Sequence, residues 1–175
     1  MRVPLCCNYT KEMEEIKGLY TYRYPHPAVA CDCVVFGLGG RELQVLLIER
    51  GQEPCKGMWA FPGGFMNIDE SAEECVLREL REETGLVVSE VRQLGCFSAV
   101  NRDPRERVIS VAFYTVVPQA EVIGGDDAAQ ARWWRLDEVP PLAFDHDEML
   151  HQAVLRLRHD LRFNPDGFGF PEGRD

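Results

Sequence analysis

The sequence lacks any long apolar run, and this absence excludes two classes of protein. A membrane-spanning helix needs about 20 consecutive apolar residues, and no segment of the 175-residue chain provides them. The start of the chain also lacks the apolar stretch of a secretory signal, and charged Lys11 and Glu12 follow it closely. We therefore expect a cytoplasmic protein with no membrane partner.

Positive charge is also scarce. Nineteen lysines and arginines stand against 29 aspartates and glutamates, which gives a formal net charge of −10. A nucleic-acid-binding protein normally presents a basic face, because phosphate neutralisation supplies most of its affinity, so we expect no nucleic-acid partner. An acidic protein can still bind a small polyphosphate if metal ions bridge the two sets of negative charge. Solubility is the simplest explanation of the acidity itself.

Paired CxxC motifs are absent, and the seven cysteines are an odd number. Both facts favour reduced thiols over a disulfide framework or a zinc site. Cys31 and Cys33 alternate along a segment that has the pattern of a β-strand. We expect them to be small buried apolar residues on one face of that strand.

The size and the 45% content of apolar residues fit one globular domain, and there is no internal repeat. Residues 1–27 form a leader in this interpretation, because Pro25 and Pro27 favour an extended arm. Residues 28–162 form the domain, and residues 163–175, rich in glycine and proline, form an irregular tail.

The hydrophobic periodicity predicts strands first, then a helix, more strands and a last helix. Such an order is typical of an α/β fold in which helices pack on both faces of a mixed β-sheet, an α/β/α sandwich. The expected strands are 28–38 and 43–49, joined as a hairpin, followed by 59–61, 87–100, 108–117 and 132–135. A tight turn at Pro62-Gly63-Gly64 closes the third strand.

Two helices are expected, each with a recognisable start. The first covers 71–84, with Ser71 suited to its N-terminus and Gly85 to the left-handed residue after its end. The second begins after Asp145, with Glu148 at capping-box spacing, and runs to about Arg162.

The first helix carries a cluster of carboxylates. Glu79, Glu82 and Glu83 stand at positions i, i+3 and i+4, so they share a helix face. Like charges so close together repel, and a hard cation such as Mg²⁺, with Mn²⁺ as a substitute, would neutralise them. A solvated acidic face balanced by Arg78 and Arg81 explains the same pattern equally well.

The surroundings of this cluster decide between the two explanations. Gly64, five residues, Glu70, seven residues and then the run from Arg78 to Leu86 match the Nudix box, GX5EX7REUXEEXGU with U aliphatic, at all nine defined positions. From about Ala28 to Arg162 the chain thus resembles a Nudix hydrolase. Members of that family hydrolyse a nucleoside diphosphate linked to another moiety with the help of divalent ions.

The resemblance implies roles for the residues of the box. Glu79, Glu82 and Glu83 would be metal ligands, and one of them would also act as the base. Arg78 would orient Glu79, and Glu70 would either pair with Arg78 or reach the metal through water.

Residues outside the box are candidates for substrate binding. Gly63 and Gly64 form a turn that can bring backbone amides close to a phosphate. Arg50 is either a phosphate ligand or surface charge. Arg102 and Arg105 either grip phosphate or the terminal ribose, or belong to a solvated loop.

Two segments outside the box, 101–105 and 142–148, resemble the bacterial ADP-ribose pyrophosphatases, which cut ADP-ribose to AMP and ribose 5-phosphate. A small nucleotide-type substrate is therefore expected. Asp126 and Asp127 could supply a further carboxylate, although an ordinary turn is the favoured interpretation of their loop.

Three further expectations concern the whole protein. One alternative activity is a house-cleaning nucleoside triphosphate pyrophosphohydrolase. Another is a ligand-sensing domain of a transcription regulator, which would continue beyond Asp175 into a winged helix.

A homodimer is expected, with the leader before Ala28 as a candidate swapped arm.

Overall fold

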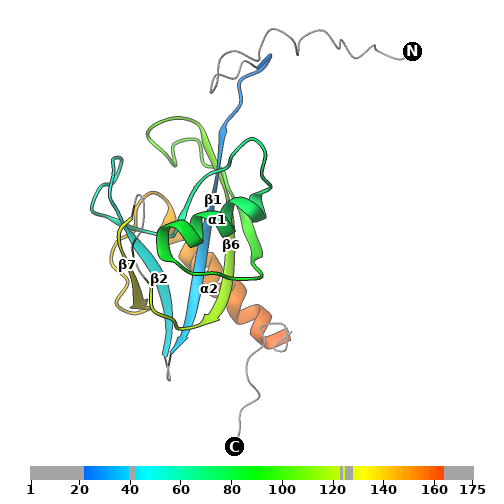
Figure 1. Cartoon of the computed structure of the whole chain (residues 1–175). Coiled ribbons are helices and arrows are strands. Elements are labelled where there is room, and N and C mark those ends of the chain that lie inside the picture. The colour runs from blue at the N-terminus through cyan, green and yellow to red at the C-terminus, as the bar shows by residue number, and fades with distance from the viewer. Residues whose placement is uncertain (1–21, 40–41, 123, 125–127, 164–175) are drawn as a thin grey trace, which may run out of the picture.

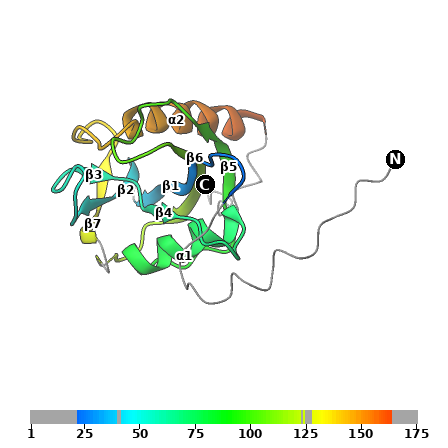
Figure 2. The ribbon, with the colours of Figure 1, turned by 90° about the horizontal axis from the view of Figure 1, so that it is seen from above.

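The computed structural model describes residues 22–39, 42–122, 124 and 128–163. Within them a seven-stranded mixed sheet lies between two helices, α1 (Ala72–Thr84) on one face and α2 (His146–Phe163) on the other (Figures 1 and 2). The strands are β1 (Ala28–Gly39), β2 (Glu42–Arg50), β3 (Trp59–Ala60), β4 (Gly63–Phe65), β5 (Arg92–Phe97), β6 (Val108–Pro118) and β7 (Ala128–Arg135). The expected α/β/α sandwich is confirmed.

The centre of the sheet is the parallel pair of β1 and β6, in register from Ala28 opposite Val108 to Leu38 opposite Pro118. The main path of the sheet runs in the order β3-β2-β1-β6-β5, and β4 and β7 add to β1 and β2. The expected hairpin of β1 and β2 is present and antiparallel. Since β4 pairs with the first half of β1, it carries the residues before α1 to that end of the sheet.

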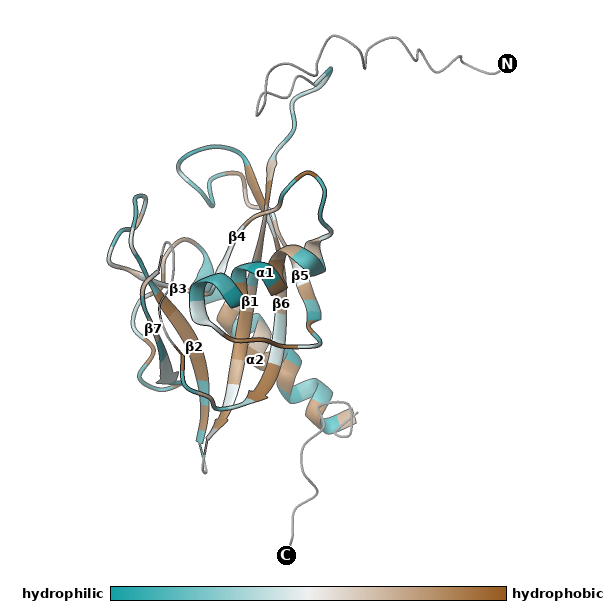
Figure 3. Ribbon diagram, viewed as in Figure 1, coloured by the Kyte–Doolittle hydropathy of each residue, from teal (hydrophilic) through white to brown (hydrophobic). Residues whose placement is uncertain are grey.

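Alternation along β1 supplies both hydrophobic cores. Cys31 and Cys33 are fully buried with Leu80 of α1, whereas Val34 and Phe36 are fully buried with the apolar residues of α2. Strands covered on both faces are expected to be apolar throughout, and Figure 3 shows the apolar residues gathered in the central strands. The two cysteines are therefore buried apolar residues, as their spacing predicted.

The ends of α1 are fixed by local sequence. The Ser71 hydroxyl accepts from the Glu74 amide, and the Glu74 carboxylate accepts from the Ser71 amide, which is a complete capping box. Gly85 ends the helix with a φ of 72°, the left-handed conformation that glycine adopts without strain. Both predicted helix ends are confirmed, and α1 is held in a fixed register by contacts within its own segment.

Three expectations about local structure were wrong in part. Residues 63–65 are not only a turn, because they pair with β1 as strand β4. The strand expected at 87–100 is shorter, because pairing with β6 begins only at Arg92. The carboxylate of Asp145 does not cap α2 as predicted, since both of its oxygens accept from the Arg102 guanidinium.

Some expectations lie outside the described residues. They concern the leader up to residue 21, the carboxylates of Asp126 and Asp127, and the tail from residue 164. In the part of the chain that the structure does describe, neither helix is long and apolar enough to cross a membrane.

Candidate active site

A pocket of about 210 Å³ lies where α1 faces β4 and the loop that follows β2. It is lined by carboxylates from α1, guanidinium groups from two other segments and backbone from β4. The lining residues are Ile48, Arg50, Gly51, Gln52, Glu53, Gly63, Gly64, Phe65, Glu79, Glu83 and Arg105. Six residues selected from the sequence thus meet in one cavity.

The two glycines of β4 allow the strand to approach its neighbours closely. A side chain on Gly64 would place its Cβ 2.5 Å from the carboxylate carbon of Glu79, well inside van der Waals contact. A side chain on Gly63 would overlap the backbone carbonyl of Cys31 in β1. Glycine is therefore required here for close packing, and the conformation of the turn is not the reason.

Glu83 is the innermost carboxylate of the pocket. Its side chain accepts a 2.8 Å hydrogen bond from the Gly63 amide, and the residue is only 6% exposed. Burial, followed by the negative charges of Glu79 and Asp32, raises the pKa of Glu83 to about 8. The Gly63 amide, predicted to face a phosphate, is thus committed to this carboxylate.

Glu79 is the second carboxylate that lines the pocket. Burial raises its pKa, and the hydrogen bond from Arg78 opposes that effect. Burial disfavours the charged form of both carboxyl groups, and a nearby cation would favour it. A divalent cation at the pocket would supply this positive charge, and oxygen donors suit a hard ion. The residues present therefore fit a divalent metal.

Arg78 connects the carboxylates of the box. Its Nε and Nη2 donate to both oxygens of Glu70 at 3.0 and 2.7 Å, and its Nη1 donates to Glu79 at 2.6 Å. This pairing lowers the pKa of Glu70 to about 2 and raises that of Arg78. Of the two roles considered for Glu70, the structure places it on Arg78.

Glu82 takes a different position from the other glutamates on its helix face. Its carboxylate accepts from Arg78 at 3.1 Å, its side chain is 37% exposed, and it does not line the pocket. Among the described residues, no three side chains of metal-binding type therefore converge on one point.

The candidate substrate-binding arginines separate in the structure. Arg50 and Arg105 line the pocket, and Asp103 holds the Nε and Nη2 of Arg105 at 3.0 and 2.7 Å. Arg102 instead has a side chain only 4% exposed, paired with Asp145 at 2.6 Å. The buried ion pair rules out the solvated loop for Arg102. Arg102 also lines a smaller adjoining cavity together with Arg50 and Arg105, so its role as a substrate ligand stays a prediction.

Sequence reasoning gave no site role to three residues around a smaller adjoining cavity: Asp32, Phe144 and His146. The Nδ1 of His146 accepts a 3.0 Å hydrogen bond from the Phe61 amide, and burial lowers the pKa of the His146 ring. The Asp32 carboxylate accepts from the Ser110 hydroxyl. The sequence contained one signal for Asp32, its place between two cysteines that were expected to be buried. An unpaired aspartate is almost never buried, so an aspartate at such a position needs a polar partner.

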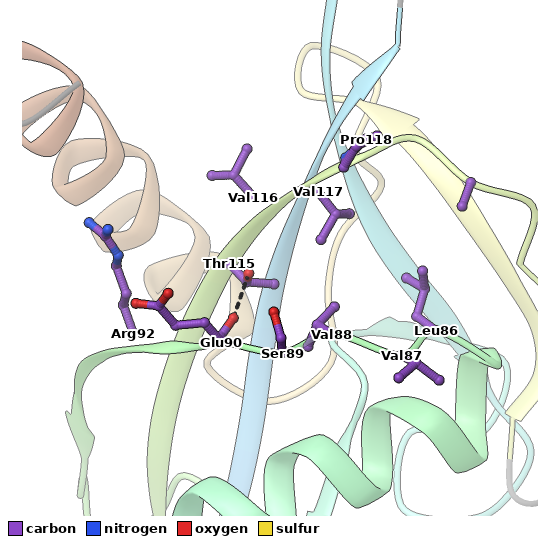
Figure 4. Close-up of a pocket in the computed structure, with 11 residues that line it drawn as sticks. Leu86, Val87, Val88, Ser89, Glu90, Arg92, Thr115, Val116, Val117 and Pro118 are labelled. Atoms are coloured by element: carbon purple, nitrogen blue, oxygen red, sulfur yellow. Dashed lines mark hydrogen bonds between the residues drawn. The ribbon is translucent and has the colours of Figure 1, made fainter. Parts of the chain in front are cut away.

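A larger cavity of about 560 Å³ lies elsewhere, between the segment after α1 and the end of β6 (Figure 4). Its lining is mainly apolar, and Glu90 and Arg92 are its only charged residues among those described. Glu90 is its only carboxylate among the described residues, so the cavity provides no cluster of oxygen ligands for a metal ion.

Comparison with known proteins places this site in context. The model of the NUDIX domain family matches residues 26–153. An ADP-ribose pyrophosphatase of Methanocaldococcus jannaschii is 43% identical over 143 residues, which cover 81% of this chain and 82% of that protein. An ADPR responsive transcriptional repressor of Acinetobacter baylyi is 29% identical, and the match covers 89% of this chain but only 64% of the repressor.

Two solved structures are similar to this fold. A MutT/nudix family protein from Enterococcus faecalis has a TM-score of 0.78 at 32% identity, covering 84% of this chain and 68% of that chain. The NUDIX domain of Shewanella oneidensis NrtR, crystallised with ADP ribose, has a TM-score of 0.73 at 34% identity, covering 77% and 90%.

Proposed function

Because this chain belongs to the NUDIX domain family and is a Nudix hydrolase, we propose that it hydrolyses ADP-ribose to AMP and ribose 5-phosphate with Mg²⁺, for which Mn²⁺ can substitute. The observation that carries this proposal is the meeting of Glu79 and Glu83 with Arg50 and Arg105 in one pocket. A diphosphate needs both kinds of group, a cation held by carboxylates and guanidinium donors for the remaining oxygens.

Each residue of the site has a separate task. Glu79, Glu82 and Glu83 would hold the ion, which would neutralise the diphosphate and lower the pKa of a bound water. Arg78 fixes the orientation of Glu79 through its contact with Glu70 on the other side. One of the three glutamates accepts the proton of the attacking water. Arg50 and Arg105 bind phosphate oxygens, and Gly64 gives the strand room beside Glu79.

The choice of ADP-ribose is supported by the relatives. The archaeal protein named for this activity covers four fifths of the chain at 43% identity, and the Shewanella domain was crystallised with the same molecule. Substrate preference is carried by residues outside the box, and Arg105 and Asp103 belong to the loop that the sequence assigned to this group.

The test is a substrate panel with the purified protein and Mg²⁺. It contains ADP-ribose, ADP-glucose, NADH and several nucleoside triphosphates, with products identified by chromatography. AMP and ribose 5-phosphate from ADP-ribose, at the highest kcat/KM of the panel, is the expected result. Release of pyrophosphate from a triphosphate, with ADP-ribose untouched, would establish the house-cleaning alternative instead.

A second candidate function is sensing of ADP-ribose without hydrolysis. The similarity to the Acinetobacter repressor and to the Shewanella domain favours it. Calorimetry separates the two: a sensor would bind ADP-ribose with Mg²⁺ present and leave it intact over hours. The intact set of box carboxylates favours the enzyme.

We also propose that the protein acts as a homodimer in the cytoplasm. The resemblance to Nudix enzymes with small nucleotide substrates supports a dimer, in which the second copy would complete the substrate pocket. Light scattering at micromolar concentration tests the dimer, and a mass of about one 19.9 kDa chain would disprove it.

A further inference from the structure

Two aromatic rings, Phe65 and Phe144, line the smaller adjoining cavity together with Arg50 and Arg105. The guanidinium carbon of Arg105 lies 5.0 Å from the ring centre of Phe65 and 6.0 Å from that of Phe144. The guanidinium carbon of Arg50 lies 4.9 Å from the same Phe144 ring. Phe144 therefore contacts both arginines of the pocket, although it comes from the segment just before α2.

The backbone of Phe144 is held in an unusual conformation. Its φ of 55° lies in the left-handed region, which a bulky residue rarely adopts and which costs free energy. The two residues that follow are anchored on other segments, Asp145 on Arg102 and His146 on the Phe61 amide. These anchors fix the position of the intervening backbone, and strain of this kind collects at functional sites.

Both arginines keep donors for a ligand. Arg105 uses its Nε and Nη2 on Asp103, and Arg50 uses its Nε on the carbonyl of Pro54. No hydrogen bond to another described residue engages the Nη1 of Arg105 or either Nη of Arg50. The two groups carry like charge, so a ring that attracts both cations stabilises their placement side by side.

We propose that Phe144 is a positioning residue for diphosphate binding, which holds Arg50 and Arg105 so that their remaining N–H groups face the pocket. The effect is on substrate binding, because the ring acts on the two arginines and not on the carboxylates that would hold the metal. The proposal rests on the proposed function for the phosphate-binding role of Arg50 and Arg105 and for the choice of ADP-ribose in the assay.

Three substitutions of one residue separate this role from simple space filling. Phe144→Leu keeps apolar bulk but loses the π-face, Phe144→Tyr keeps the ring, and Phe144→Ala loses both. The KM for ADP-ribose is expected to rise roughly tenfold in the Leu and Ala variants, the loss that two partly exposed cation–π contacts represent together, while kcat changes little. The Tyr variant is expected to retain the wild-type KM.

The matched control is Phe163→Leu. Phe163 at the end of α2 also carries an arginine over its ring, Arg162 at 5.5 Å, but it is exposed and does not line the pocket. This variant should leave KM unchanged. A wild-type KM in Phe144→Leu, or a KM in Phe144→Tyr as high as in Phe144→Ala, would overturn the proposal, because either result means that the ring face does not matter.

A second measurement does not depend on ADP-ribose as the substrate. Inorganic pyrophosphate is titrated into each variant with Mg²⁺ in a calorimeter, and the same order of affinities is expected. If the wild-type protein ignores ADP-ribose, the substrate proposal fails while the titration still tests Phe144. Equal pyrophosphate affinity in wild type and Phe144→Leu would overturn the positioning role even if ADP-ribose is the substrate.

A double-mutant cycle covers the case in which Phe144→Ala does not fold. If Phe144 acts through Arg105, the effects of Phe144→Leu and Arg105→Gln on pyrophosphate affinity should be less than additive. Fully additive effects would mean that the two side chains work independently, which contradicts the proposal.

Discussion

The Gly63 amide donates a 2.8 Å hydrogen bond to the carboxylate of Glu83, which joins β4 to the last turn of α1. The residues lie 20 positions apart in the chain. This contact places the innermost carboxylate at the base of the pocket, where burial and the neighbouring Glu79 and Asp32 hold its pKa near 8. Because this contact joins them directly, β4 and α1 each help to fix the position of the other.

Glu83→Gln and Glu79→Gln are expected to lower kcat by at least about a hundredfold, because each removes a carboxylate that would hold the metal ion. In Glu83→Gln the amide oxygen of the new side chain can still accept from the Gly63 amide, so the melting temperature should change little in that variant. The exposed Glu73, on the first turn of the same helix, supplies the control Glu73→Gln. Steady-state kinetics with full turnover in both box variants would rule out the metal site.

Alanine should lower activity at one of the two glycines and stability at the other. In Gly64→Ala the new Cβ meets the far end of the Glu79 side chain, so the carboxylate moves and activity falls about tenfold or more while the fold survives. In Gly63→Ala the Cβ meets the backbone of β1, so the free energy of unfolding falls by about 1–3 kcal/mol. Urea titrations and kcat measured side by side check both; the reverse pattern would show that the close contacts are assigned wrongly.

Arg78→Lys should raise the Mg²⁺ concentration needed for half-maximal activity. Lysine cannot reproduce the paired contact with Glu70 while also reaching Glu79, so the Glu79 carboxylate loses its orientation. A loss of about tenfold or more in kcat/KM is expected, typical of groups that support metal ligands. The exposed Arg81 provides the matched control Arg81→Lys, and equal Mg²⁺ dependence in the two variants would contradict the role.

Removal of divalent ions should abolish activity, and Mg²⁺ should restore it. Because a ligand that binds only the folded state stabilises it, Mg²⁺ should also raise the melting temperature of the wild type. The rise should be absent or much smaller in Glu83→Gln. Activity that persists in EDTA after extensive dialysis would contradict the proposed chemistry.

Stability should fall as the pH drops below about 6.5, in part because of His146. Burial lowers the pKa of this ring below its ordinary value of 6.5, so the unfolded chain takes up a proton more readily than the folded one. The contribution of His146 to the free energy of unfolding is complete above the pKa of the unfolded chain. It is lost as the pH falls toward the pKa of the folded protein, and the free energy of unfolding then changes by at most about 1.4 kcal/mol per pH unit.

Urea unfolding of wild type and His146→Gln between pH 5 and pH 8 measures this contribution. The variant should be less stable at pH 8, since the Phe61 amide loses its imidazole acceptor, but its stability should depend less on pH. His151→Gln, an exposed change on the same helix, serves as the control. An unchanged pH slope in His146→Gln would mean that other groups cause the acid sensitivity.

Much of the fold was predictable because it depends on short-range patterns. The capping box at Ser71 and the left-handed Gly85 define α1 through contacts between residues no more than four positions apart. The apolar periodicity of residues 28–38 and 43–49 similarly predicted two buried strands, which the structure confirms. The ends of strands were harder to predict. Hydrophobicity alone extended the strand to Val87, which is 80% exposed, whereas β5 begins only at Arg92, where its pairing with β6 starts.

The candidate site was predictable only where one helix defines it. The spacing of Glu79, Glu82 and Glu83 placed them on one face, but β4 lies against only part of that face. As a result Glu79 and Glu83 line the pocket and Glu82 turns to Arg78. Arg102 and Arg105 looked equivalent in the sequence, and they differ because Asp145, 43 positions away from Arg102, binds one of them and not the other.

The sequence by itself determined the reaction class, because the box is a local pattern of charge, glycine and helix periodicity that needs no distant partner to be recognised. The tertiary structure alone decided which carboxylates are buried, and it brought Asp32 of β1 together with Phe144 and His146 from the start of α2. The reason is physical: burial and electrostatic coupling depend on distances in space, and a sheet that joins β1, β4 and β6 sets those distances between residues far apart in the chain.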